Sequence, residues 1–102
     1  MTVNVVAAPN NVPPTVKITA PKNNATVYRI FGTTIKAEAA DANGRVTKVE
    51  FYAGTTLLGS DSAAPYSFSW RPSSTGNQVL TAKAYDDDGA VTTSAPVTVR
   101  VR

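Results

Sequence analysis

The sequence predicts an all-β protein of about seven short antiparallel strands, packed as a sandwich or a small barrel. Apolar and polar residues alternate with a period of two along most of the chain, as in strands that bury one face. No segment shows the longer period of an amphipathic helix. Turn residues separate the alternating runs at short intervals, which is typical of sandwiches and barrels.

The alternating runs define the predicted strands in chain order. In each run the apolar residues are expected to point into the core and the polar residues outward. The residues expected to point inward are Val16 and Ile18, then Ile35, Ala37 and Ala39, then Val49 and Phe51, then Tyr66, Phe68 and Trp70, then Leu80, Ala82 and Ala84, and finally Val97, Val99 and Val101.

Turn signals lie between these strands. Proline, glycine, asparagine and aspartate supply the backbone angles and local hydrogen bonds of tight turns. They occur at residues 21–24, Asn43-Gly44, Gly54, Gly59, Ala64-Pro65, residues 72–77 and Asp88-Gly89.

Residues 1–11 have a different character from the rest of the chain. The TVNV run at 2–5 repeats the pattern of the TVRV run at 98–101, and a proline-containing segment follows it. One interpretation is that residues 1–11 are a linker or the end of a preceding repeat, so that the parent protein carries tandem modules. The other is an N-terminal strand that pairs at the edge of this module. On either interpretation the module proper covers residues 12–102.

The composition excludes several classes of function. The chain has no cysteine and no histidine, so thiol nucleophiles, Ser-His-Asp triads, Cys/His zinc sites, haem ligation and disulfides lack their reagents. The net charge is +3, but the basic residues are spread over the whole length rather than clustered, which does not favour a nucleic-acid partner. No apolar run approaches the ~20 residues of a membrane span, so no membrane insertion is expected.

Catalysis by a carboxylate pair is also not expected. Glycoside hydrolysis needs two carboxylates ~5–10 Å apart across a cleft. Glu38 and Glu50 are each in the middle of a strand and are expected to face outward on different sheets. No catalytic residue is therefore assigned, and the protein is not expected to be an enzyme.

Several sequence blocks together carry a family resemblance. They are VPPTVKITAP at 12–21, AADANG at 39–44, VTKVEFY at 46–52, LLG at 57–59, APYSFSW at 64–70 and LTAKAYD at 80–86. Read in this order, residues 12–102 resemble a bacterial immunoglobulin-like domain, of the type found in secreted glycoside hydrolases and cell-surface proteins. The resemblance implies an immunoglobulin-like antiparallel sandwich, with Ala37 and Ala82 about where immunoglobulin cysteines would form the disulfide that this chain lacks.

The resemblance also implies a function and a location. A secreted or cell-surface, noncatalytic accessory module is expected, which spaces and orients neighbouring domains, most simply in a polysaccharide-degrading enzyme. Its partners would be the neighbouring domains of the same chain, and it would be a monomer. Two alternatives stay open: a carbohydrate-binding module for cellulose, chitin or xylan, and a repeat of a surface adhesin.

One candidate site lies at a pole of the predicted sandwich. In immunoglobulin strand order, Asp41 and the run Asp86, Asp87 and Asp88 end strands at the pole where the chain enters, near Asn10 and Asn11. Hard oxygen ligands supplied by loops suit calcium. The alternative is that these aspartates are ordinary turn residues. A structural calcium ion is the one cofactor that the sequence suggests.

A second candidate site is the outer face of the third and sixth predicted strands. There Tyr52 and Tyr85 could stack on sugar rings while Glu50 and Lys83 bind hydroxyl groups. Because the two strands are antiparallel, the tyrosines are expected at opposite ends of this face. The alternative is ordinary sheet stabilisation by a Glu50–Lys83 cross-strand pair, worth ~0.2–1 kcal/mol.

Two further aromatic segments remain ambiguous in the sequence. Trp70 shares its parity with core residues, but it ends a strand and could be half-exposed at the opposite pole, in contact with a glycan or a neighbouring module. The YRIF run at 28–31 is either a core-facing part of an edge strand or an exposed contact patch.

Overall fold

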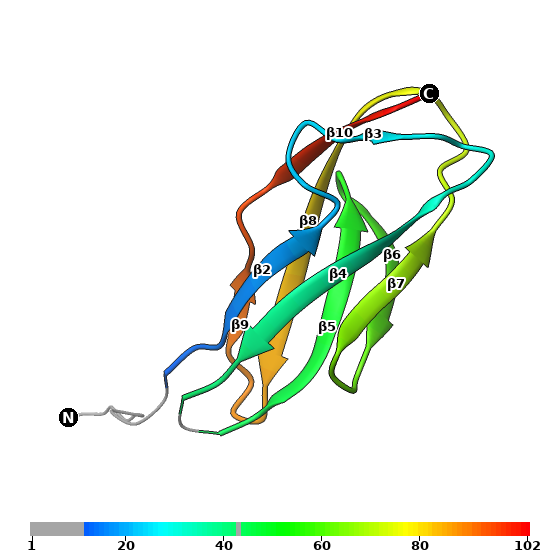
Figure 1. Cartoon of the computed structure of the whole chain (residues 1–102). Coiled ribbons are helices and arrows are strands. Elements are labelled where there is room, and N and C mark those ends of the chain that lie inside the picture. The colour runs from blue at the N-terminus through cyan, green and yellow to red at the C-terminus, as the bar shows by residue number, and fades with distance from the viewer. Residues whose placement is uncertain (1–11, 43) are drawn as a thin grey trace.

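The computed structural model describes residues 12–42 and 44–102 as a sandwich of two β-sheets (Figure 1). The interpretation of residues 1–11 as a linker, a repeat end or an edge strand lies outside the described residues. Within them the strands are β2 (Thr15–Ala20), β3 (Thr26–Val27), β4 (Thr33–Ala40), β5 (Val46–Ala53), β6 (Thr56–Asp61), β7 (Tyr66–Trp70), β8 (Gly76–Asp86), β9 (Val91–Thr93) and β10 (Val97–Val101). The described residues contain no helix that could cross a membrane.

The two sheets differ in size. The smaller sheet has the order β2-β4-β7, and the larger has the order β3-β10-β8-β5-β6, with β9 also pairing with β8. All pairs are antiparallel except β3 with β10. The predicted all-β sandwich is confirmed. The alternating runs read from the sequence did not include β6, nor the strands β3 and β9, which are only two and three residues long.

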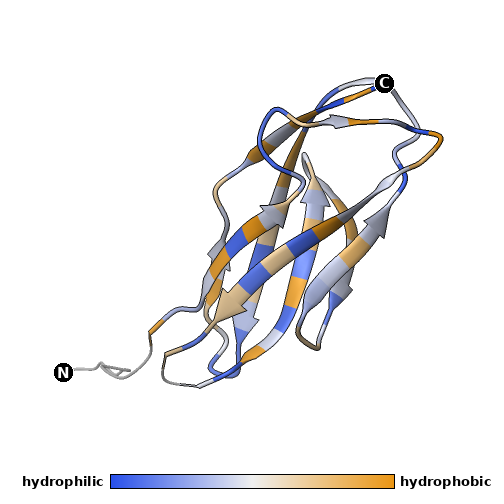
Figure 2. Cartoon of the chain, viewed as in Figure 1, coloured by the Kyte–Doolittle hydropathy of each residue, from blue (hydrophilic) through white to orange (hydrophobic). Residues whose placement is uncertain are grey.

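The core lies between the sheets and follows the predicted parity. Val49, Phe51, Leu80, Ala82 and Ala84 are fully buried in the larger sheet. From the smaller sheet, Ile35, Ala37, Tyr66 and Trp70 are buried against them, while Phe68 is partly buried. Figure 2 shows the alternation of hydrophobic and hydrophilic residues along the strands. Without a disulfide, this packing joins the sheets.

The turn predicted at Gly59 is wrong, because Gly59 lies inside β6. A glycine is needed at this position because of side-chain packing and not because the chain turns there. A Cβ atom built on Gly59 would overlap the ring of Phe68 from the opposite sheet. That ring stacks on Phe51, with 6.3 Å between the ring centroids and an interplanar angle of 25°. Gly59 therefore leaves the space that the two phenylalanines need.

The loops gather at two poles of the sandwich (Figure 1). At the pole where residue 12 enters, the loop after β4 meets the loop after β8, and the Asp87 amide donates to the Arg45 carbonyl at 3.1 Å. At the opposite pole, the loop between β3 and β4 contacts the C-terminal residue, and the Arg29 amide donates to the Arg102 carbonyl at 2.9 Å. The described chain thus enters at one pole and leaves at the other.

We expect Gly59→Ala to lower the free energy of unfolding by about 1–3 kcal/mol, since the added methyl group overpacks the Phe68 ring. This cost should outweigh the ~0.4–1 kcal/mol that a glycine-to-alanine change contributes through the unfolded chain. Urea denaturation measures the effect. As a control, Gly59→Ala made in a Phe68→Leu background should cost less, because the smaller side chain leaves room. An equal cost in both backgrounds would show that the two residues are not coupled.

Candidate functional site

The outer face of β5 and β8 carries a compact polar group, here called the outer-face cluster, that consists of Lys48, Glu50, Tyr52, Lys83 and Tyr85. Antiparallel pairing positions these residues, with Lys48 opposite Tyr85, Glu50 opposite Lys83 and Tyr52 opposite Thr81. Because their parity is opposite to that of the core residues, all five side chains leave the sheet on the same outer side.

Glu50 is the centre of the outer-face cluster. The hydroxyl groups of Tyr52 and Tyr85 both donate to Glu50 Oε1, at 2.9 and 2.7 Å, and Lys48 Nζ lies 3.3 Å from Glu50 Oε2. These partners leave the Glu50 side chain only 12% exposed. The register places Tyr52 and Tyr85 at opposite ends of the face, as expected, on either side of the Glu50–Lys83 pair. Their hydroxyl groups nevertheless reach the same carboxylate oxygen, which the sequence did not predict.

The lysines occupy the faces of the two tyrosine rings. Lys48 Nζ lies 4.7 Å from the centroid of the Tyr85 ring, and Lys83 Nζ lies 4.9 Å from that of Tyr52. These are cation–π distances. Glu50 does face Lys83 across the strands as expected, but its ion pair is with Lys48 on its own strand. Each ring thus has an ammonium group over one face, where a sugar would have to stack.

The hydrogen bonds of the outer-face cluster shift the pKa values of its members. The hydrogen bond from Tyr85 is the main cause that lowers the pKa of Glu50, and Tyr52 and Lys48 lower it further against an opposing effect of burial. The same bond raises the pKa of Tyr85 to about 12, because an ionised phenol can no longer donate to the carboxylate and is repelled by it. The pKa of Tyr52 is also raised, mainly by its hydrogen bond to Glu50.

The structure does not bring Trp70 to the outer-face cluster. Trp70 ends β7 in the other sheet and is 6% exposed, as part of the core. Of the residues considered for carbohydrate binding, only Glu50, Tyr52, Lys83 and Tyr85 form one surface. The signal for core placement was the shared parity of Trp70 with Tyr66.

Three of the four aspartates considered for metal binding come together. Asp41 follows β4, Asp86 ends β8 and Asp87 follows it, and one carboxylate oxygen from each lies within 4.8 Å of the others. We call these three residues the aspartate cluster. Asp88 is not in this group, although its amide donates to Asp86 Oδ1 at 3.0 Å. Asn10 and Asn11, expected nearby, lie outside the described residues.

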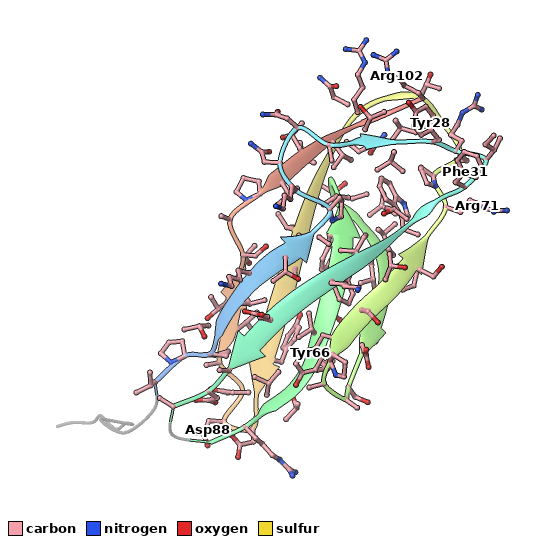
Figure 3. The ribbon with its side chains drawn as sticks, viewed as in Figure 1. Tyr28, Phe31, Tyr66, Arg71, Asp88 and Arg102 are labelled. Carbon is pink, nitrogen blue, oxygen red and sulfur yellow. The ribbon has the colours of Figure 1, made fainter. Side chains whose placement is uncertain are left out.

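The opposite pole carries an exposed apolar surface, here called the apolar tip and made of Tyr28, Ile30 and Phe31. Tyr28 is 50% exposed, and Ile30 and Phe31 are each 75% exposed. The Tyr28 and Phe31 rings make an edge contact with centroids 6.3 Å apart, and Arg71 Nη2 donates to the Ile30 carbonyl at 3.1 Å. Figure 3 shows Tyr28, Phe31, Arg71 and Arg102 at this end of the molecule and Asp88 at the other. The YRIF run is therefore not part of the core.

Comparison with known proteins identifies a family model and similar solved structures. A family model described as a bacterial Ig domain matches residues 14–82. Among solved structures, the fibronectin(III)-like modules of Clostridium thermocellum CbhA are 40% identical, with 88% of this chain and 46% of that chain covered and a TM-score of 0.75. This chain thus spans less than half the length of that structure. The comparison with curated proteins found no match.

Two longer enzymes contain a similar fold. The endo-β-1,4-mannanase from Thermotoga petrophila is 12% identical, with 89% of this chain and 20% of that chain covered and a TM-score of 0.70. The modular endo-β-1,4-mannanase from Cellulomonas fimi is 22% identical, with 96% and 20% covered and a TM-score of 0.63. At these identities the likeness concerns the fold alone.

We expect the stabilising effect of Glu50 to depend on pH with a defined sign. Because the pKa of Glu50 is lower in the folded protein than its ordinary value of 4.5, the stability that Glu50 contributes is present above this value and is lost as the pH falls through the folded pKa. The difference in unfolding free energy between the parent and Glu50→Gln should therefore shrink as the pH drops below about 4.5. Urea denaturation at pH 7 and at pH 3 measures it.

Two further measurements test the same network. Glu38→Gln is the matched control, because the Glu38 side chain is 70% exposed and pairs only with an equally exposed Lys17. It should change stability by less than about 0.5 kcal/mol. In the alkaline range, the Tyr85 phenol should ionise near pH 12 in the parent and closer to pH 10 in Glu50→Gln, as followed by ultraviolet absorbance. Identical alkaline titrations would contradict the bond between Tyr85 and Glu50.

Proposed function

This chain belongs to the bacterial Ig domain family, and from that premise we propose that it is a noncatalytic accessory module that spaces and orients neighbouring domains. The observation that carries the proposal is the placement of its ends. The described chain enters at the pole of the aspartate cluster and leaves at the pole of the apolar tip (Figure 1). A module with its two connections at opposite poles keeps its neighbours apart by its own length.

The parent protein that we propose is a secreted or cell-surface multidomain protein, most simply a polysaccharide-degrading enzyme. This is supported by the relatives, since a similar fold occurs as a small part of two endo-β-1,4-mannanases.

The apolar tip supports a direct contact with the domain that follows. The C-terminal residue is tied to the tip, because the Arg102 amide donates to the Val27 carbonyl at 2.8 Å and the Arg102 carbonyl accepts from the Arg29 amide. Contiguous exposed apolar side chains mark interaction surfaces. Arg29, Arg71 and Arg102 surround the tip, so an acidic surface would fit it best. The entry pole of a second module of this kind, with its aspartates, offers such a surface.

A catalytic role for the two glutamates as a pair is not supported by their positions. Glu38 is exposed on β4 of the smaller sheet, and Glu50 lies on β5 of the larger sheet. The two glutamates face outward from opposite sides of the sandwich. A core of packed side chains therefore separates them, and they cannot flank one glycosidic bond.

Carbohydrate binding is the second candidate function, and one observation favours it. Tyr52 and Tyr85 share one surface with Glu50 and Lys83, and their hydroxyl groups meet at Glu50 Oε1. Two observations weigh against it: the hydroxyl groups of both tyrosines are already bound to Glu50, and a lysine lies over each ring. An adhesin repeat is a third candidate, but no contact among the described residues supports it.

We expect the purified chain not to be retained on cellulose, chitin or xylan in a pull-down, because the outer-face cluster satisfies its own polar groups. Tyr52→Ala and Tyr85→Ala should behave as the parent does, as should Tyr28→Ala at the other pole. Retention that both outer-face variants lose and Tyr28→Ala keeps would establish carbohydrate binding in place of the spacer function.

Spacing and orientation can be tested with a two-module protein, in which residues 12–102 are followed by residues 7–11 and by a second copy of residues 12–102. Small-angle X-ray scattering should give an extended particle with a narrow distribution of shapes. Replacement of Tyr28, Ile30 and Phe31 by serine in the first copy should broaden this distribution, because the contact between modules is lost. The same change in the second copy is the control, since its tip has no following module. Equal effects of the two changes would contradict a contact through the tip.

A further inference from the structure

We propose that the aspartate cluster of Asp41, Asp86 and Asp87 is a calcium-binding site. It lies where the loop after β4 meets the loop after β8, at the pole opposite the apolar tip. The proposal does not depend on the module's function as a spacer. It rests on one buried carboxylate oxygen, on the separation of the three carboxylates and on the way the two loops hold each other.

Asp86 is the residue whose surroundings indicate a cation site. It is only 4% exposed, and its Oδ1 accepts hydrogen bonds from the Asp88 amide at 3.0 Å and the Ala90 amide at 2.7 Å. Its Oδ2 is shielded from solvent and has no hydrogen-bond donor among residues 12–42 and 44–102. Because Oδ1 accepts two hydrogen bonds from the 88–90 turn, we assign Oδ2 as the oxygen that Asp86 offers to a cation. Buried carboxylate oxygens are normally bound by donors or by metal ions, since an uncompensated buried charge is costly.

A purely structural role as a turn residue explains the contacts of Asp86 Oδ1 but not the burial of Asp86 Oδ2. The two amide bonds to Oδ1 are the side-chain-to-backbone bonds of an ordinary aspartate turn. They do not explain why a second oxygen is buried beside two further carboxylates.

The separation of the three carboxylates matches one calcium ion. Calcium binds oxygen ligands at about 2.3–2.6 Å, so two ligands on opposite sides of the ion lie roughly 4.8 Å apart. One oxygen from each aspartate lies within 4.8 Å of the others. A single ion can therefore contact all three, with backbone carbonyls or water as the remaining ligands. Without a cation, three carboxylates at this separation repel one another.

The two loops hold the third carboxylate in place. Asp87 Oδ1 accepts a hydrogen bond from the Arg45 amide at 3.4 Å, and the Asp87 amide donates to the Arg45 carbonyl at 3.1 Å. Gly44 passes so close to the Asp87 carboxylate that a Cβ atom at this position would overlap it. The backbone of one loop thus positions a ligand that the other loop supplies.

The ligand chemistry selects calcium among the common divalent ions. The chain has no histidine or cysteine, so the nitrogen and sulfur ligands that favour zinc and copper are absent from its sequence. Magnesium keeps several of its waters and is usually bound by one or two carboxylates. Three carboxylates, supplied by the end of β8 and by the loops that follow β4 and β8, fit the larger and less demanding calcium ion better.

Isothermal titration calorimetry on the whole chelator-treated 102-residue chain tests the proposal, with calcium chloride and magnesium chloride as titrants. We expect one calcium site, with a Kd on the order of 10⁻⁴–10⁻³ M as in other extracellular modules, and at least tenfold weaker binding of magnesium. Calcium at ~100 times the Kd should raise the melting temperature by roughly 10 °C.

Three variants locate the site. Asp86→Asn and Asp87→Asn should each weaken calcium binding at least tenfold, because each removes one anionic ligand. Asp88→Asn is the matched control, since it removes the same charge from the same loop but from outside the aspartate cluster, and its Kd should stay within about twofold of the parent. If Asp86→Asn does not fold, the exposed Asp87 provides the test by itself.

The proposal is overturned by any of three results. The parent could show no heat of binding and the same melting temperature with calcium as with chelator. Magnesium could bind as tightly as calcium, which would contradict the assignment to calcium. Asp88→Asn could weaken binding as much as Asp87→Asn, which would show general attraction to an acidic pole rather than a site.

Discussion

The antiparallel pairing of β5 with β8 is the interaction on which the other features of this molecule depend. On its inner side it places Val49 and Phe51 beside Leu80, Ala82 and Ala84, which are all fully buried. On its outer side it assembles the outer-face cluster around Glu50. At its end, Val46 pairs with Asp86, and this pairing brings the loops before β5 and after β8 together at the aspartate cluster. A shift of one residue in this register would exchange the two faces and separate the aspartates.

Because the chain has no disulfide, the two sheets are held together by side-chain packing. Ala37 and Ala82 are both buried, so small side chains occupy positions where the sheets approach each other. Larger side chains fill the remaining space, and Phe68 reaches across to stack on Phe51 above Gly59. The chemistry is confined to the outer face and the poles, where it does not disturb the core.

Some features could be predicted from the sequence and others could not, for identifiable reasons. The parity of Val49, Phe51, Leu80 and Ala82 was readable, because alternate residues of a strand point to opposite sides whatever their partners are. Gly59 was misread as a turn, because a glycine that makes room for a ring on another strand looks the same in sequence as a glycine in a loop. The gathering of Asp41 with Asp86 was anticipated from strand order, but the separation of their oxygens was not.

The sequence by itself determined the fold class, the two faces of each strand and the absence of thiol and imidazole chemistry, since all of these follow from residue type and spacing. Only the tertiary structure decided that Tyr52 and Tyr85 converge on Glu50, that the YRIF run is exposed, and that Asp88 stands outside the aspartate cluster. These features depend on register and on the paths of loops around neighbouring strands. They arise from contacts between residues that are distant in the chain, and no local pattern records them.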